Sequence, residues 1–171
     1  MNKSSYGRNS ILNGTGIILG AILGLIFIFV RMFCENPYET IYRLDPSGVI
    51  PALWLLNLIS FIWFFLIGYS AGCALDCVLC KKGNCNEQLA IFKGFIAFIV
   101  CFFLSHISNY AFFGGRHLFI AILLNLTALV CSAFTAIIWL KTNKISALIM
   151  GGYCIWLFYL FILYSSVLFH L

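Results

Sequence analysis

The segment LAIFKGFIAFIVCFFLSHISNYAFF, residues 89–113, decides the fold, because Lys93 is its one charged side chain. A helix crosses the hydrocarbon core of a membrane, about 30 Å thick, with roughly 20 apolar residues. The segment is long enough for that crossing and lacks the alternating pattern of a membrane β-barrel strand. It is therefore predicted to be a transmembrane α-helix.

Four further apolar runs of similar length surround this segment, at residues 11–33, 49–75, 118–140 and 145–169. The 171-residue chain is 63% hydrophobic and 9% charged, whereas about a quarter of the residues of soluble domains are charged. A surface that apolar would aggregate in water, and a surrounding lipid bilayer removes the problem. We predict a single membrane domain over residues 1–171, an all-α integral membrane protein built as a bundle of five transmembrane helices.

The run at residues 11–33 follows Lys3 and Arg8, as the apolar core of a secretory signal would. It is longer than the roughly 7–15 residues of such a core, and no small-residue cleavage box follows it before Arg31. We interpret this run as a retained helix.

Lysine and arginine are distributed unequally between the two ends of the predicted helices. Seven lie on the side of the N-terminus and three on the other side: Lys3, Arg8, Lys81, Lys82, Lys93, Lys141 and Lys144, against Arg31, Arg43 and Arg116. Basic loops stay in the cytoplasm, so the N-terminus is predicted to be cytoplasmic and the C-terminus exoplasmic. These charges do not cluster into a basic stripe, and no nucleic-acid partner is predicted.

The connections between the predicted helices differ in length. The loop at residues 34–48 is long enough to fold over the outer end of the bundle, whereas the connections near Arg116 and Lys141 are very short. Short connections make the third, fourth and fifth helices antiparallel neighbours.

Glycines at four-residue spacing line one face of the first predicted helix, at Gly16, Gly20 and Gly24. Small residues in such a stripe let the backbone of another helix approach closely. The stripe is predicted to serve packing within the bundle or, alternatively, a homodimer.

Polar residues recur on one face of the third predicted helix, at Ser105, Ser108 and Asn109, and Phe112 continues this face. A polar group that faces lipid without a partner is costly. The face is therefore predicted to point inward, where it forms hydrogen bonds between helices or lines a cavity.

His106 lies on a neighbouring face of the same helix, and two interpretations of it are open. The imidazole could bind haem iron or relay protons, but a lone histidine without a second ligand favours a hydrogen-bonded structural role. The same structural interpretation applies to Asn57, Ser60, Asn125 and Thr127.

Four of the eight cysteines gather where the second predicted helix meets the following loop, at Cys73, Cys77, Cys80 and Cys85. If the helix continues past Leu75, the first three share one face, and the fourth could complete a tetrathiolate zinc site. A single CxxC is a weak metal signal, and in the cytoplasm free thiols are expected. Juxtamembrane acylation is a further alternative.

The second predicted helix is entered through PSGVIPALW, residues 46–54. The TspO/MBR family of tryptophan-rich sensory proteins, or translocator proteins, has Pro-x-Trp-Val-Phe-Pro-x-x-Trp at this place. Pro46, Pro51 and Trp54 match that pattern in register. With five spans and a long first loop, the chain resembles a divergent member of this family over most of its length.

Further matches to the family lie in the last three helices, at Phe112, Phe113, Gly114, Arg116, Ala121, Tyr153 and Trp156. The chain departs from the family pattern at Ser105, where asparagine is usual, Ser108 for tryptophan, Leu124 for an acidic residue and Tyr164 for asparagine. Several of these are pocket positions, which leaves open an altered ligand choice or no ligand.

The resemblance implies a pocket between helices, roofed by the first loop, that binds tetrapyrroles such as protoporphyrin and haem or, in some members, sterols. A flat macrocycle needs stacking surfaces, apolar walls and a few polar groups. The candidate ligand-binding residues are Trp54, Trp156, Tyr153, Phe112, Pro51, Ser105, Ser108 and, by its location, Arg43. The protein would be a sensor or carrier that requires no cofactor, with the porphyrin or haem as its ligand.

Two other functions remain open: a small transporter or channel using the polar face of the third helix, and a structural assembly partner using the glycine stripe. Ordinary enzyme chemistry is not predicted, because the sequence shows no carboxylate pair, nucleophile–base set or cofactor motif. The resemblance implies one exception, light-dependent porphyrin degradation involving Trp54 and Trp156.

Overall fold

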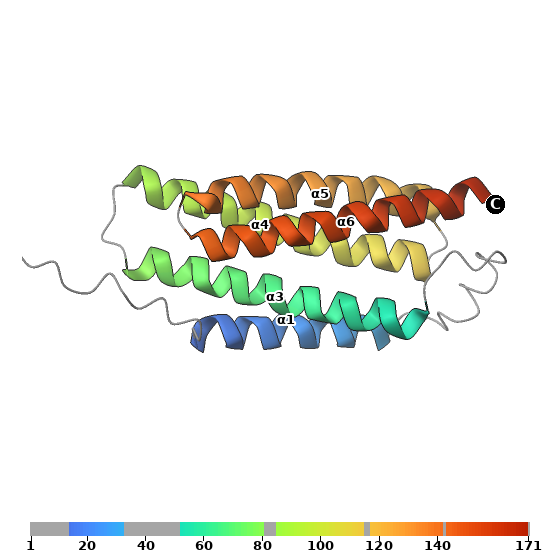
Figure 1. Ribbon diagram of the computed structural model, residues 1–171, viewed down its shortest axis with the longest axis horizontal. Helices are drawn as coiled ribbons and strands as arrows, with labels where there is room; N and C mark the ends of the chain where they lie inside the picture. The colour runs from blue at the N-terminus through green and yellow to red at the C-terminus, as the bar shows by residue number, and fades with distance from the viewer. Residues whose placement is uncertain (1–13, 33–51, 81–84, 115–116, 142, 171) are drawn as a thin grey trace, which may run out of the picture.

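The computed structural model describes residues 14–32, 52–80, 85–114, 117–141 and 143–170. Five α-helices lie within them: α1 (Gly14–Met32), α3 (Leu53–Cys80), α4 (Cys85–Phe113), α5 (Leu118–Leu140) and α6 (Lys144–His170). The helices lie alongside one another, along the longest axis of the molecule (Figure 1). The predicted all-α bundle is confirmed.

Four of the described helices, α3 to α6, are long and apolar enough to cross a membrane. The 19 residues of α1 are apolar as well, and at 1.5 Å per residue they span about 28 Å. Two ends differ from the predicted spans, because α3 continues to Cys80 and α4 begins at Cys85. The prediction followed hydropathy, which falls at Asp76 and Glu87, whereas the helical backbone continues past both.

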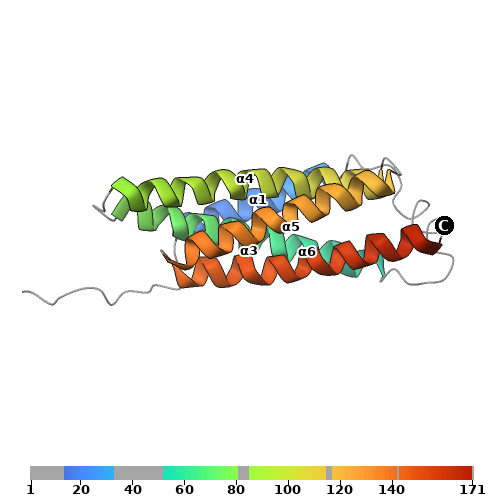
Figure 2. The same ribbon diagram turned by 90° about the horizontal axis from the view of Figure 1, so that it is seen from above.

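The helices form a pair and a group of three. α1 packs mainly on α3, α5 packs on both α4 and α6, and smaller contacts of α3 with α6 and α4 join the two groups. With a few contacts between α1 and α4, the bundle closes into a ring in the order α1, α3, α6, α5, α4. Figure 1 shows α1 and α3 together on one side of the other three helices, and in Figure 2 the pair lies behind them. The predicted adjacency of the last three helices is confirmed.

The glycine stripe of α1 packs against α3. A Cβ on Gly20 would lie 2.7 Å from the backbone oxygen of Phe65, and one on Gly24 would lie 2.9 Å from the ring of Phe61. Glycines of α3 face back, since a Cβ on Gly68 would lie 2.8 Å from the Cα of Gly20. The stripe therefore has the packing role within the bundle that the sequence predicts.

Polar side chains join the group of three helices. On α5, the Asn125 amide donates to the Leu157 carbonyl oxygen of α6 at 2.8 Å, and the Ser132 hydroxyl donates to that of Met150 at 3.2 Å. At the start of α6, the Asn143 side-chain oxygen accepts bonds from the backbone N–H groups of Ile145 and Ser146. Asn143 thus caps the helix where the short connection predicts a turn.

The two ends of the bundle differ in which helices begin and finish there. The Gly14 end is the one where α1 begins and α3 finishes, and the His170 end is the one where α6 finishes and α3 begins (Figure 1). Lys93, Lys141 and Lys144 belong to the Gly14 end, because they lie near the start of α4, after α5 and at the start of α6.

Candidate pocket at the His170 end

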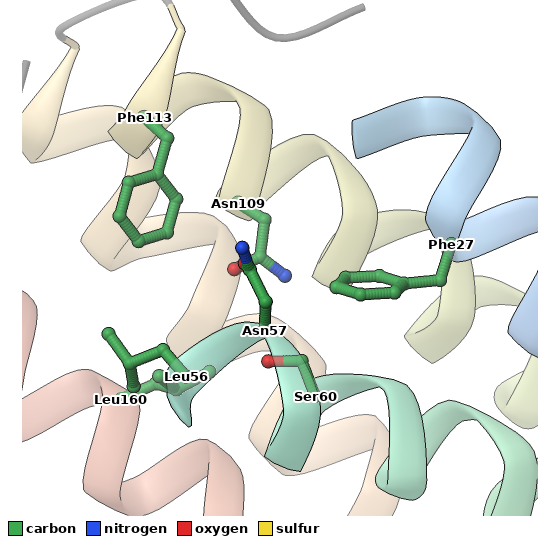
Figure 3. A pocket seen from close by; sticks show the side chains of 7 residues that line it. All are labelled: Phe27, Leu56, Asn57, Ser60, Asn109, Phe113 and Leu160. Atoms are coloured by element: carbon green, nitrogen blue, oxygen red, sulfur yellow. The ribbon is translucent and has the colours of Figure 1, made fainter. Parts of the chain in front are cut away.

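A small pocket with an interior volume of about 20 Å³, seen from close by in Figure 3, lies in the half of the bundle toward the His170 end. Its lining comes from four helices: Phe27 of α1, Leu56, Asn57 and Ser60 of α3, Asn109 and Phe113 of α4, and Leu160 of α6. The pocket thus lies where the α1–α3 pair meets the other group of helices. Its interior has room for about one water molecule, far less than the roughly 300–1,000 Å³ of pockets that enclose a whole ligand.

Three of the lining side chains are polar, and they differ in how they are bonded. Asn109 is engaged, because its NH₂ group donates to the Ser105 carbonyl oxygen and its side-chain oxygen accepts the Tyr164 hydroxyl, both at 2.9 Å. Neither the Asn57 amide nor the Ser60 hydroxyl bonds to another described residue, although Ser60 is only 7% exposed. The hydrogen-bonded role predicted for Asn57 and Ser60 thus has no partner among the described residues and stays a prediction.

The same prediction is correct for one member of the set and incomplete for another. Asn125 is buried and bonded across to α6, as predicted. Thr127 is exposed on α5 and donates to the Leu123 carbonyl oxygen of its own helix at 2.8 Å. Asn57 and Ser60 are thus set apart from the other polar residues at membrane depth, and they face a pocket.

The side chains of the pocket converge on its centre. In Figure 3 the Asn57 and Asn109 amides point toward each other, with Ser60 below them and the Phe27 ring to one side. Phe113 and the two leucines form the remaining wall. The arrangement is a small polar group inside an apolar frame, which is typical of sites for mostly apolar ligands.

An aromatic cluster around His106 lies next to the pocket and shares Phe27 with it. The imidazole stacks on the Phe64 ring, with centroids 4.4 Å apart, and meets the Phe102 ring edge-on at the same distance. The Phe27 ring lies 6.1 Å away. The buried Nε2 atom has no hydrogen-bond partner among the described residues. The predicted hydrogen-bonded role is thus not met at this nitrogen, and ring stacking holds the imidazole instead.

The polar face of α4 points inward, as predicted, but it is satisfied by neighbouring helices. Tyr153 of α6 donates to the Ser105 hydroxyl at 2.9 Å, and the Ser108 hydroxyl donates to the Ala121 carbonyl oxygen of α5 at 2.8 Å. The Phe112 ring stacks on Tyr164 with centroids 4.0 Å apart. All four of these predicted binding residues lie in the packed core beside the pocket and do not line it.

The two tryptophans singled out by the sequence also lie outside the pocket lining. Trp54 is at the start of α3 and 65% exposed, because Leu56 and Ser60, four residues apart, turn another face of the helix to the pocket. Trp156 is half-buried, stacks on Tyr159 at 5.3 Å and packs against the same core cluster as Leu160.

Several predicted site residues lie outside the described residues, and their roles stay predictions. These are Arg43, Pro51 and the loop at residues 34–48. α3 does continue to Cys80, the condition that places three cysteines on one face. Cys73 is buried, but the side chains of Cys77, Cys80 and Cys85 are not described, and the zinc hypothesis stays a prediction.

The apolar part of the lining has no recognisable signal in the sequence. Phe27, Leu56, Phe113 and Leu160 look like any other apolar residue of a transmembrane helix. The polar part did carry a signal, because Asn57 and Ser60 are three residues apart on one helix and Asn109 belongs to the inward face of another. Their shared location only became visible when the helices were placed.

Comparison with known proteins agrees with this architecture. The sequence model of the TspO/MBR family matches residues 17–169. Protein MTL1 of Saccharomyces cerevisiae (strain ATCC 204508 / S288c) is 30% identical over 82 residues, and the match covers 41% of this chain and only 15% of that protein. No solved structure matches significantly. Because the family match extends over nearly the whole chain, this integral, multi-pass membrane protein belongs to the TspO/MBR family.

Proposed function

We propose that this protein binds a planar hydrophobic molecule, of the tetrapyrrole or sterol class, in the pocket at the His170 end, and acts as a sensor or carrier. The observation that supports this most is the unbonded polar pair, Asn57 and Ser60, facing a pocket at membrane depth. The two side chains line the pocket, with Asn57 partly buried and Ser60 buried, and polar groups at membrane depth are often part of functional sites. A ligand that bonds to them would account for their presence.

The lining fits part of a tetrapyrrole. Phe27 and Phe113 offer aromatic surface, and Leu56 and Leu160 offer apolar walls for the edge of a macrocycle. None of the described lining residues is charged, so this part of the site holds no partner for a propionate group. A tetrapyrrole is therefore expected to enter with one small uncharged substituent foremost and to leave its carboxylates at the mouth.

A channel is less well supported by the packing. Beside the pocket, the rings of Phe27, Phe64, Phe102 and His106 are in mutual contact, and toward the Gly14 end the buried Trp139 packs against Phe95 and Phe98. These rings fill the described interior with apolar surface, which opposes passage of a hydrated ion.

The proposal is tested by titrating detergent-purified protein with protoporphyrin IX and, separately, with a fluorescent sterol. We expect saturable quenching of tryptophan fluorescence, reduced in Trp156→Phe because this indole packs against the core cluster that includes the pocket residue Leu160. Ser60→Leu fills the pocket and should weaken binding, whereas Thr127→Leu, on the exposed face of α5, should leave it unchanged. No saturable binding of either ligand class would overturn the proposal.

We also propose that the pocket half of the bundle faces away from the cytoplasm. The support is the excess of lysine and arginine on the N-terminal side of the spans predicted from the sequence, seven against three, of which Lys93, Lys141 and Lys144 are described at the Gly14 end. Single cysteines introduced at Lys141 and at His117, in a variant without native cysteines, should be labelled by a membrane-impermeant maleimide from opposite sides. Labelling of the Lys141 position from outside intact cells would reverse the orientation.

A further inference from the structure

We infer that the pocket is a site for one ordered water molecule, which joins α3 to α4 by hydrogen bonds to Asn57, Ser60 and Asn109. The inference goes beyond the proposed function and is tested without a ligand. A substituent of a ligand that enters the pocket would displace this water and take over its hydrogen bonds.

The first step concerns the size of the pocket. Its interior volume is about 20 Å³, and one water molecule needs roughly 10–15 Å³ of such a volume. The pocket therefore has room for one water. Cavities with a purely apolar lining stay dry, so the polarity of the lining decides whether a water enters.

The second step concerns the hydrogen bonds that the lining offers. The Asn57 amide has two donor hydrogens and an acceptor oxygen, and the Ser60 hydroxyl can donate and accept. Asn109 donates one N–H to the Ser105 carbonyl oxygen and accepts the Tyr164 hydroxyl at its side-chain oxygen, which leaves its second N–H for the pocket. Buried waters typically make about three hydrogen bonds. One water can therefore bond to all three side chains at once.

The third step concerns the helices from which these groups come. Asn57 and Ser60 belong to α3, and Asn109 faces them from α4 (Figure 3). Between α3 and α6, the Ser70 and Ser146 hydroxyls bond directly to each other's carbonyl oxygens, at 3.0 and 2.8 Å. Between α3 and α4, the polar side chains lie around a space of the size of a water instead. A water in this space makes the polar contact between the two helices.

The bridge extends to a third helix. The Tyr164 hydroxyl of α6 donates to the Asn109 oxygen at 2.9 Å, and hydrogen bonds in such a chain polarise and strengthen one another. The water thus connects the α1–α3 pair, through Asn109, to both α4 and α6. Direct packing between the two groups of helices is small, which gives a bridge at this place a structural role.

The test is NMR spectroscopy of the ligand-free protein in detergent micelles, with isotope-labelled asparagine side chains. Magnetisation transfer from water to an amide proton reports a water that stays close to it. We expect transfer to the side-chain amides of Asn57 and Asn109. Asn125, buried and bonded directly to the Leu157 carbonyl oxygen, is the internal control and should show none. Asn143, partly exposed at the Gly14 end, should show transfer from bulk water.

Two variants test the place of the water. Ser60→Val fills the space and removes the hydroxyl, and Asn57→Leu removes the amide, so each should abolish the transfer to Asn109 on the other helix. Thr127→Val, which removes a hydroxyl bonded within its own helix, is the matched control and should leave this transfer unchanged. An Asn125 amide signal at the parent position shows that a variant is folded.

Three outcomes would overturn the inference. The parent could show transfer to Asn143 and none to Asn57 and Asn109, which would mean that the pocket is dry. Asn125 could show as much transfer as the pocket residues, which would mean that the whole bundle is hydrated. Transfer to Asn109 could persist in both folded variants, which would place the water elsewhere. The proposed function is decided separately, by the ligand titrations.

Discussion

Gly72 of α3 meets Gly16 of α1 so closely that the two backbones are in contact. A Cβ on Gly72 would stand against the Cα of Gly16 and 2.6 Å from its nitrogen. The atoms that this Cβ would meet belong to the backbone of α1, which cannot shift in the way that the end of a flexible side chain can. The α1–α3 pair is therefore built on backbone approach, and this pair supplies one side of the pocket through Phe27, Asn57 and Ser60.

Gly72→Ala should separate α1 from α3. Overpacking against backbone costs about 1–3 kcal/mol, and we expect a loss of that size in reversible unfolding in mixed micelles of detergent and SDS. Gly14→Ala is the control, because a Cβ there meets nothing within 4 Å. Equal stability of the two variants would contradict the packing of α1 on α3 described here.

Gly151→Ala and Gly152→Ala should have opposite effects although the residues are adjacent in α6. A Cβ on Gly152 would lie 2.7 Å from the far end of the Trp63 ring, whereas one on Gly151 meets nothing within 4 Å. Alanine is favoured over glycine in a helix interior by up to about 1 kcal/mol. Thermal unfolding should show a stabilised Gly151→Ala and a destabilised Gly152→Ala, and the same sign for both would refute the assignment.

Substitution of Ser70 or Ser146 by alanine should weaken the packing of α3 on α6. The Ser70 hydroxyl donates to the Ser146 carbonyl oxygen at 3.0 Å, and the Ser146 hydroxyl donates to that of Ser70 at 2.8 Å. Hydrogen bonds between helices in membranes are worth about 0.6 kcal/mol on average, so each Ser→Ala change should cost about that much in unfolding. Thr127→Val, which removes a bond within one helix, should cost less, and an equal cost would argue against a special role for the serine pair.

His106→Phe should stabilise the protein. The phenyl ring keeps the stacking on Phe64 and Phe102 and removes the buried Nε2 that has no partner among the described residues. An unsatisfied buried polar group costs about 1–3 kcal/mol. Removing it should therefore raise the free energy of unfolding by part of that amount, which would appear as a higher unfolding midpoint. His117→Phe, at an exposed position, serves as the control. A loss of stability would mean that the imidazole nitrogen is bonded in the membrane.

The sequence alone predicts the positions of the transmembrane helices and some of the helix faces that pack against other helices. Hydropathy identified the transmembrane helices, because every residue of a span must be acceptable to lipid or to another helix, and α5 occupies Leu118–Leu140 as predicted. The glycine stripe of α1 and the polar face of α4 are predicted to face other helices. The spacing of glycines can be recognised within one helix, and so can polar side chains that need hydrogen-bond partners inside a membrane. Both predictions are confirmed by Gly16, Gly20, Ser105 and Ser108.

The tertiary structure alone decided which residues form the pocket. Motif matching favoured Trp54, Trp156 and Tyr153, yet Tyr153 is bonded to Ser105 in the core and Trp54 is exposed. Asn125 donates to the Leu157 carbonyl oxygen of another helix, whereas Asn57 lines the pocket, although the two residues are of the same type and both lie in transmembrane helices. Spacing along a helix fixes the face on which a side chain lies, whereas what that face meets depends on the placement of the other helices.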